Sequence, residues 1–345
     1  MDVRRVLPRD AIPSVDDLTF GPDNVGGDDD RVLVLELADE ARAYPVRILD
    51  FHEVVNDRVG DRPVAVTWCP LCGAGVVYDR RVSGAPGRGD ATGSTGGTVP
   101  PGGGSGGATG GSGAAVLSFG VSGKLADDDL VMYDRETGSE WKQSTGLAID
   151  GPLSGTELRV LPAAMTTYGA FRETHPDGVV LQPPGGESEA ASDTDDPAPI
   201  DYDRRPYESY LSGEGAGLGA HRGTGGRDWD REDVDPKAVV LGVGDGDAAL
   251  GFPRPRLLDV GGVGSATVGG QRVVAFATPD GVHGFEDPGL EFEPVGDGRF
   301  RADGAVWQGS TGRSEDGRRL ERVPGRRLFA FAWQDDHGPE AFWSP

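Results

Sequence analysis

The sequence predicts an α+β protein that is predominantly β and consists of two divergent tandem copies of one strand-rich unit, each closed by a short helix. Two observations lead to this prediction. Short apolar or alternating runs bounded by turn residues are typical of β-strands, and the same residues recur in the same order in the two halves of the chain. With 345 residues, the chain is long enough for two domains of ordinary size.

The runs predict the strands of the first unit, and turn sequences such as Asp134-Arg-Glu-Thr-Gly138 separate them. The best helix follows at Met165–Thr174. It ends before His175-Pro176, because a residue that precedes proline avoids the helical conformation. We expect its counterpart in the second unit at Leu328–Asp336. The predicted strands are Val32–Leu37, Val64–Trp68, Gly75–Tyr78, Val116–Phe119 and Leu130–Tyr133.

The recurrence begins where Arg47-Ile-Leu-Asp50 matches Arg256-Leu-Leu-Asp259. Further matches follow at equal offsets, and so many in one order indicate a duplication. They pair Val54 with Val263, Gly60 with Gly269, Pro70 with Pro279, and Trp141-x-x-x-Thr145-Gly146 with Trp307-x-x-x-Thr311-Gly312.

Two segments of low complexity interrupt the predicted units. Residues 83–113 are nearly all Gly, Ser, Thr, Ala and Pro and predict a flexible Gly-rich loop. Residues 183–235 are acidic and Gly-rich, and we expect a linker that cannot bury enough apolar surface to become ordered. The predicted organisation is an N-terminal extension at 1–30, the first unit at 31–182, this linker, and a degenerate second copy at 236–345.

The composition is strongly acidic. The chain has 57 Asp and Glu residues and 33 Lys and Arg residues, so the formal net charge is -24. Such a surface is typical of a halophilic protein, in which concentrated salt screens the repulsion between carboxylates. The charge argues against nucleic acid and anionic membranes as partners, and leaves a small molecule or another protein. We expect no membrane span, no signal peptide and a cytoplasmic location.

The candidate reactive site is the pair Cys69 and Cys72, at the end of the strand Val64–Trp68. Two thiolates at C-x-x-C spacing suit a soft metal ion or reversible disulfide formation. A thioredoxin fold is not expected, because Gly73-Ala-Gly75 and β-branched residues follow where that fold begins a long helix. The alternative interpretation is a pair of small buried thiols in a turn.

His52 and Glu53 lie just upstream of this strand and complete the candidate site. In the second copy the two residues align with Gly261 and Gly262, and the cysteines align with Thr278 and Gly281. The joint loss of all four is what one site would show when one copy degenerates. A lone histidine is nevertheless more often structural than a ligand. By the same comparison, the residues that recur in both copies are interpreted as structural, and a histidine in the linker as idle: Asp150, His175, Trp141, Trp307 and His221.

Several motifs resemble the DUF3179 family, a domain of unknown function, in a haloarchaeal-type member. They cover about residues 30–182, and the long Gly-rich insertion after Arg81 departs from the pattern. The resemblance supports the first unit as one domain and places His52, Cys69 and Cys72 inside family motifs, but it implies no substrate or cofactor. The motifs are His52-Glu53, Asn56-Asp57, Cys69-Pro-Leu-Cys-Gly73, Phe119-Gly-Val-Ser-Gly123, Asp129-Leu-Val-Met-Tyr-Asp-Arg135, Trp141-x-Gln143, Gly151-Pro-Leu-Ser-Gly155 and His175-Pro176.

Three classes of function follow from these residues. The first is a metal-binding protein, with Cys69, Cys72 and His52 as ligands and a fourth position taken by Glu53, water or substrate. Zinc is the expected metal and copper the alternative, and an open position would suit a metal-dependent enzyme. The second is a metal-free thiol–disulfide redox protein, and the third a non-enzymatic scaffold or interaction protein. Whether the chain is an enzyme stays open at this point.

Overall fold

The computed structural model describes residues 1–345 except 38, 84–113, 193 and 195. Strands hold 41% of the residues and helices 14%, which confirms the predominantly β class. The predicted Gly-rich loop 83–113 lies, apart from Ser83, outside the described residues. None of the helices in the described part of the chain has the length and hydropathy of a membrane-spanning segment.

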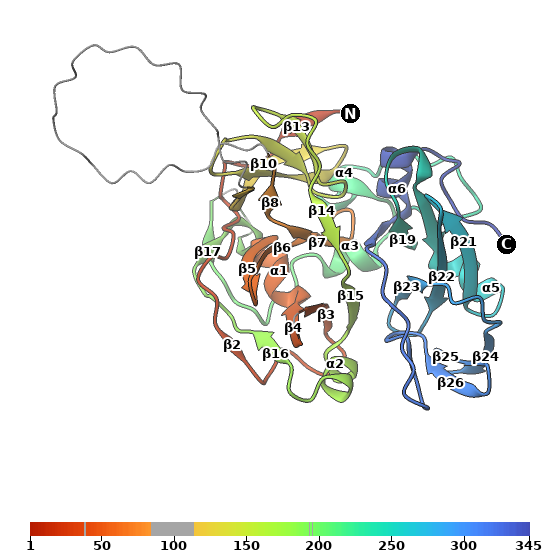
Figure 1. Ribbon diagram of the computed structural model, residues 1–345. Coiled ribbons are helices and arrows are strands. Elements are labelled where there is room, and N and C mark those ends of the chain that lie inside the picture. Colours follow the sequence, from red (N-terminus) through yellow and green to blue (C-terminus); the bar gives the residue numbers. More distant parts are fainter. Residues whose placement is uncertain (38, 84–113, 193, 195) are drawn as a thin grey trace, which may run out of the picture.

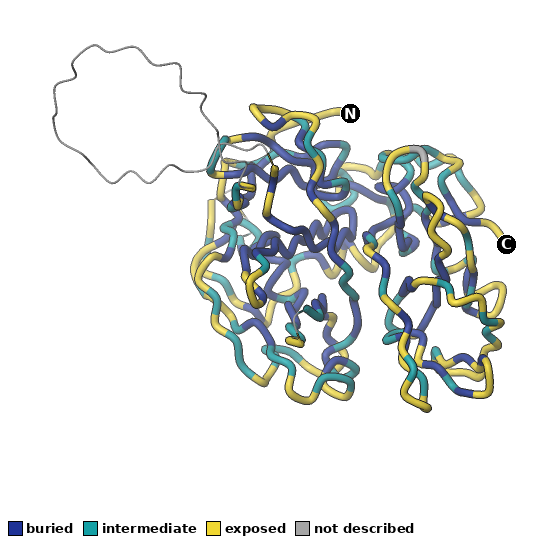
Figure 2. Tube along the Cα trace, viewed as in Figure 1, coloured by how far each residue is buried: buried dark blue, intermediate teal, exposed yellow. Residues whose placement is uncertain are grey.

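A seven-stranded antiparallel sheet forms the centre of the molecule and contains strands from both halves (Figure 1). Its N-terminal part is a meander whose strands are buried along most of their length (Figure 2). Its C-terminal part joins this meander through the pairing of Arg327 with Gly75. In spatial order the strands are β20 (Leu250–Pro253), β19 (Val239–Val243), β28 (Arg326–Phe329), β7 (Ala74–Asp79), β6 (Arg62–Cys69) and β5 (Val54–Val59), with β14 (Arg159–Leu161) also pairing β7.

Two five-stranded sheets complete the first half. One carries the long hairpin that covers the cysteine turn, in the order β1 (Val3–Arg5), β10 (Phe119–Ala126), β11 (Asp129–Asp134), β12 (Glu140–Lys142) and β13 (Leu147–Asp150). The other is β15 (Ala164–Thr167), β3 (Arg31–Leu37), β4 (Glu40–Pro45), β16 (Val179–Leu181) and β2 (Phe20–Gly21). Helices α1 (Val46–His52) and α2 (Tyr168–Thr174) follow β4 and β15, and β8 (Arg81–Val82) pairs β9 (Ala115–Val116).

The second half contains a smaller set of sheets beside its share of the central one. It has the meander β21 (Val263–Val268), β22 (Gln271–Ala277) and β23 (Val282–Glu286), and the four short strands β24 (Glu293–Gly296), β25 (Arg299–Ala302), β26 (Ala305–Gln308) and β27 (Arg313–Ser314). Helices α5 (Arg254–Asp259) and α6 (Ala330–His337) complete it.

The elements of the two halves follow one another in the same order. In each half a strand pair leads into a short helix, a three-stranded meander, a run of four antiparallel strands, and a last strand with a helix. The last strand pairs the first in both cases, β15 with β3 and β28 with β19.

The predicted elements are mostly present, with two shifts. The predicted helices begin late, because residues 164–167 and 326–329 are strands that pair with β3 and β19. At the first of these the Thr167 hydroxyl accepts a hydrogen bond from the Ala170 N–H (3.3 Å) and so caps α2. The predicted strand Val116–Phe119 is divided between the end of β9 and the start of β10.

Residues 183–235, expected to remain without order, fold onto the first half. They contain β17 (Glu187–Ser188), β18 (Ala198–Pro199), η1 (Glu189–Ala191), α3 (Glu208–Ser212) and α4 (Gly217–His221). The composition did not predict this order because much of the buried area of the segment comes from a few aromatic side chains. Tyr202, Tyr207 and Tyr210 are all buried, and each tyrosine can bury 150–250 Å² or so.

Candidate metal centre

The turn between β6 and β7 carries both cysteines. Cys69 is the last residue of β6 and pairs with Ala74, the first residue of β7. Gly73 closes the turn with φ +58°, a conformation that favours glycine. Both thiols are free and buried, and the Phe329 N–H donates to the Cys72 carbonyl oxygen (2.8 Å). The last strand of the second half therefore covers the turn.

A third group joins the two thiols from a different sheet. Asp129 is the first residue of β11, and its carboxylate lies beside the turn. One potential ligand atom from each of Cys69, Cys72 and Asp129 lies within 4.8 Å of the other two. The Cys72 thiol donates to Asp129 Oδ1 (2.9 Å), and the Ser144 N–H donates to Oδ2 (2.8 Å). Within the described residues, this is the one group of three His, Cys, Asp or Glu side chains placed to hold a metal ion.

Burial sets the protonation of this cluster. It raises the pKa of Cys72 well above its usual value and also raises the pKa of Cys69. The pKa of Asp129 is raised as well, chiefly by burial, although the neighbouring Lys142 ammonium opposes the shift. All three pKa values move toward the protonated form, because a buried charge without a counter-ion is unfavourable. The cluster therefore retains protons that a cation would have to displace.

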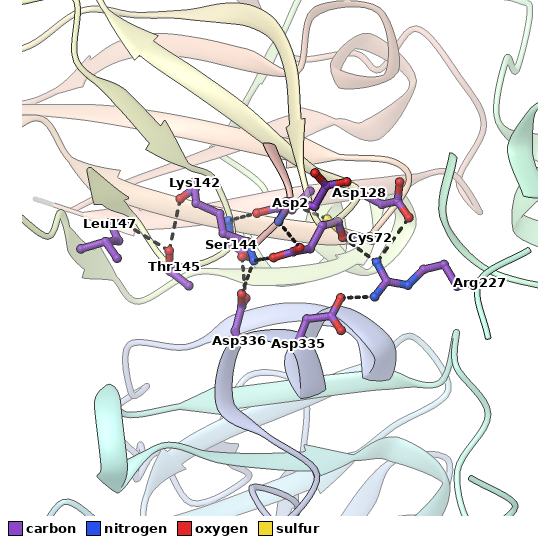
Figure 3. Close-up of polar contacts among 12 residues, drawn as sticks. Asp2, Cys72, Asp128, Lys142, Ser144, Thr145, Leu147, Arg227, Asp335 and Asp336 are labelled. Carbon is purple, nitrogen blue, oxygen red and sulfur yellow. Dashed lines mark hydrogen bonds and ion pairs between the residues drawn. The ribbon is translucent and has the colours of Figure 1, made fainter. Parts of the chain in front are cut away.

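The second half of the chain braces the cluster through α6. Asp336 accepts from the Lys142 ammonium (2.5 Å) and from the Ser144 hydroxyl (2.6 Å). Figure 3 shows Asp336 reaching from α6 toward both residues. Although burial alone would lower it, the pKa of Lys142 is raised by Asp336 and Asp129. Ser144 thus connects the Asp129 carboxylate to the C-terminal helix.

Glu53 faces the cluster from across a small cavity. A cavity of 80 Å³ is lined by Cys69 and Glu53 together with Glu189, Tyr207 and His221. Glu53 ends α1 with φ +57°, which is strained for a residue with a side chain. Burial first, then the carboxylates of Glu189, Asp50 and Asp129, raises the pKa of Glu53 to about 8. A carboxyl group with such a pKa can exchange a proton near neutral pH.

His52 does not reach the cysteines in this structure. Its Nδ1 lies 2.8 Å from the Pro13 carbonyl oxygen and its Nε2 lies 2.7 Å from the Tyr202 hydroxyl. A carbonyl only accepts, so Nδ1 carries the hydrogen and Nε2 accepts from Tyr202. Burial lowers the pKa of His52, although the bond to Pro13 opposes this. Both ring nitrogens are occupied, and the ring packs on Tyr202 with centroids 6.1 Å apart.

The structure adds residues that sequence reasoning did not single out. Asp129 was part of a motif, but the only local signal was three successive aspartates, 127–129, before an apolar strand. His221, interpreted as idle, packs against the rings of Tyr207 and Tyr210 at centroid distances of 5.0 and 5.9 Å. The Tyr210 hydroxyl donates to the Leu71 carbonyl oxygen inside the cysteine turn (2.5 Å). No spacing rule connects a linker tyrosine to a turn 139 residues away.

Comparison with protein-family models gives one match, DUF3179, a protein of unknown function, over residues 9–341. The match is wider than the motifs at about 30–182 suggested, and it includes the second half. Comparison with curated proteins and with solved structures gives no match.

Proposed function

Because the chain belongs to the DUF3179 family, whose function is unknown, we propose a function from the site itself: it is a metal-binding protein with zinc at Cys69, Cys72 and Asp129, and copper as the alternative. The observation that carries this proposal is the convergence of two thiols and a carboxylate from two sheets within 4.8 Å. Sulfur and carboxylate oxygen are both ordinary zinc ligands.

The hydrogen bond between the Cys72 thiol and Asp129 supports the proposal. In a tetrahedral zinc site the ligand atoms are about 3.3–3.8 Å apart, as follows from zinc–ligand distances of about 2.0–2.3 Å. Cys72 Sγ and Asp129 Oδ1 lie closer than this, at 2.9 Å, with a proton between them. A divalent cation would replace that proton and compensate the charges of the groups once they are deprotonated.

The cavity gives the proposed metal an open side. Three protein ligands leave one coordination position, as in catalytic zinc sites. Cys69 lines the cavity that Glu53 faces, so a water molecule bound there would lie near Glu53. We therefore propose a metal-dependent enzyme: a metal held by Cys69, Cys72 and Asp129 would lower the pKa of a water in its open position, and Glu53 would be placed to exchange a proton there rather than to serve as a permanent ligand.

The metal-free redox alternative has weaker support. Thiol–disulfide exchange proceeds through a thiolate, and its cysteines typically have lowered pKa values. Here burial raises the pKa of Cys69 and of Cys72, and both side chains are at most 1% exposed. A metal ion that binds both sulfur atoms would stabilise the thiolate forms that burial otherwise disfavours.

We also propose that the two halves arose by duplication and that the second copy lost the site. The matching residues and the matching order of elements support this. The second copy then retains a supporting role, since β28 covers the cysteine turn and α6 supplies Asp336. The acidic, lysine-poor composition supports a haloarchaeal-type source, and two free thiols in C-x-x-C spacing support a reducing, cytoplasmic environment.

Metal content of the purified protein tests the proposal. The wild type, grown with zinc and passed through a desalting column, should retain one zinc per chain by inductively coupled plasma mass spectrometry. Cys72→Ser and Asp129→Asn should lose most of it, because two of three ligands then remain. Stoichiometric zinc that persists unchanged in both variants would contradict the proposed ligands.

His52→Gln and Glu53→Gln are the matched variants in the same experiment. The sequence predicts both residues as part of the site, and both side chains are buried. We expect each variant to retain zinc. Loss of zinc in His52→Gln, with the fold intact by circular dichroism, would instead make His52 a ligand and would require the loop to rearrange.

A further inference from the structure

A second cavity lies on the other side of the cysteine strand, between the two halves of the chain. Its volume is 480 Å³, within the usual range for small-molecule sites. Trp68, at the end of β6, and Phe329, at the end of β28, provide apolar lining. The cavity in which Glu53 faces Cys69 shares no lining residue with this one.

Arg327 supplies an uncompensated charge to this cleft. The residue is 9% exposed, and one of its Nη atoms donates to the Gly73 carbonyl oxygen. Its guanidinium lies 5.6 Å from the centroid of the Trp68 ring and 5.4 Å from that of Phe329. No carboxylate of the described residues forms an ion pair with it. Burial, followed by repulsion from Arg31, lowers the pKa of Arg327 to about 9, so the group remains charged at neutral pH.

Two further arginines extend this positive region. Arg31, the first residue of β3, also lines the cleft; the residue as a whole is exposed, although protein surrounds its guanidinium group. Burial of its guanidinium and the nearby Arg254 lower the pKa of Arg31. Arg254 donates to the Thr278 carbonyl oxygen. As with Arg327, neither forms an ion pair with any carboxylate that the structure describes. Of these three arginines, Arg31 and Arg327 line the cleft itself.

The remaining charges of the cleft are mostly paired. Arg47 and Arg205 both bind the Asp30 carboxylate. Asp50 accepts from the Trp68 indole N–H (2.8 Å), and burial raises its pKa to about 7, so part of it is neutral. The Lys237 ammonium donates to backbone carbonyl oxygens, and Asp29 and Glu208 lie among the lining residues. The acidic groups of the cleft therefore leave Arg31 and Arg327 available to a ligand.

We propose that this cleft binds a small organic anion, a carboxylate or phosphate attached to an apolar or aromatic group. The anionic group lies between the guanidinium groups of Arg31 and Arg327, and the apolar group packs on Trp68 and Phe329. Arginine suits this role because its planar donors match carboxylate and phosphate oxygens. The inference does not depend on a metal at the cysteines. It goes beyond the proposed metal centre and adds a binding site for a separate molecule.

Binding of defined probes tests the site. Isothermal titration calorimetry of the full chain at constant KCl concentration would use benzoate, phenyl phosphate, inorganic phosphate and the uncharged benzyl alcohol. We expect benzoate or phenyl phosphate to bind, and to bind more tightly than inorganic phosphate or benzyl alcohol. Arg31→Gln should weaken the better probe about tenfold, the usual loss for one charge-assisted contact. Preference for benzoate or for phenyl phosphate assigns the anionic group.

The control variant is Arg299→Gln, on an exposed strand of the second half with a weak ion pair to Asp297. It should bind like the wild type. Arg31 is exposed, so we expect the Arg31→Gln variant to keep the fold. Arg327→Gln removes a hydrogen bond to the cysteine turn, and its binding is compared only if the variant retains the melting temperature of the wild type. The proposal is overturned if neither aromatic anion binds at about 10 mM, if benzyl alcohol binds equally well, or if Arg299→Gln weakens binding as much as Arg31→Gln.

Discussion

The two cysteines differ in what surrounds their sulfur atoms. Cys72 is fully buried and donates to Asp129, whereas Cys69 lines the small cavity and its sulfur lies 4.0 Å from the Asp128 carbonyl oxygen. A proton held between a thiol and a carboxylate is difficult to remove, since its loss would leave two negative charges in a buried site. Cys69 is therefore the more accessible of the two thiols.

Alkylation of the metal-free protein should reveal this difference. With iodoacetamide at pH 8, we expect both cysteines to react at least about a hundred times more slowly than in the unfolded chain, because thiolate formation is suppressed. Cys69 should be modified before Cys72. Both cysteines lie on one tryptic peptide, so tandem mass spectrometry that locates the modified cysteine at successive times measures both rates, and the same protein in denaturant is the reference. Faster modification of Cys72 would contradict the assigned environments.

The turn from β6 to β7 requires a glycine for two reasons: its backbone conformation and the close packing of β28. Gly73 adopts φ +58°, and a Cβ atom there would lie 2.7 Å from Phe329 Cζ and 2.8 Å from an Nη atom of Arg327. The first property belongs to many turns, but the second arises only because β28 lies against this one. The shape of the cysteine turn is thus matched to the last strand of the chain.

Gly73→Ala should destabilise the protein by about 3 kcal/mol, the sum of backbone strain and displacement of a packed strand. Gly138→Ala is the matched control, with φ +75° and nothing within 4 Å of the added Cβ. It should cost only about 1 kcal/mol, from the backbone alone. Denaturant unfolding of the two variants measures the difference. Equal losses would mean that β28 does not press on the turn.

The two halves of the molecule are interlocked rather than placed side by side. The central sheet takes strands from both, and Asp336 of α6 binds residues of the first half. A further connection lies at the surface, where Glu36 of β3 binds Arg319 (2.8 Å) and lies 3.4 Å from His175 Nε2. The close approach of the His175 ring is the largest influence, and with Arg319 it lowers the pKa of Glu36 to about 2, although burial opposes the shift.

The Glu36 contacts should make stability depend on pH in acid. A carboxylate whose pKa is lowered on folding stabilises the native state above its unfolded pKa of about 4.3, and this contribution disappears as the pH falls toward 2. Glu36→Gln should therefore be less stable than the wild type by about 1 kcal/mol at pH 6, since the network is partly exposed. The two proteins should converge near pH 2.

Thermal unfolding of both proteins between pH 2 and pH 6 at fixed salt measures this difference. Asp297→Asn is the control, since Asp297 has only an exposed pair at 3.7 Å and should give no such trend. A Glu36→Gln deficit that stays constant down to pH 2 would show that the side chain acts through packing and not through its charge.

The sequence was sufficient for the strand-rich class and for the hairpin that holds the cysteines. The apolar run Val64–Trp68 and the turn residues after Cys72 are local patterns, and such patterns can be recognised from neighbouring residues without knowledge of the fold. Asp129 could not be predicted as a neighbour of Cys72, because the contact joins two sheets and has no sequence periodicity. The same applies to Tyr210 and Asp336, whose partners lie 139 and 192 residues away.

His52 illustrates the opposite error that a sequence argument can make. It is close to Cys69 along the predicted order of elements, and proximity in order suggested proximity in space. The structure directs its ring toward Pro13 and Tyr202 instead, and the second of these belongs to a segment that composition predicted to be unordered. The side on which a helix-terminal side chain points depends on the residues that pack there, and those come from elsewhere in the chain.

The late position of β28 in the chain has a consequence for biosynthesis. Its contact with the cysteine turn closes a loop of 254 residues, so the central sheet is incomplete until nearly the whole chain has been synthesised. Contacts of such long sequence separation slow folding. Until β28 arrives, β7 is paired with β6 and β14, but its Gly75 and the cysteine turn lack the cover that β28 gives them. The maturation of the cysteine turn thus waits for the C-terminus to leave the ribosome.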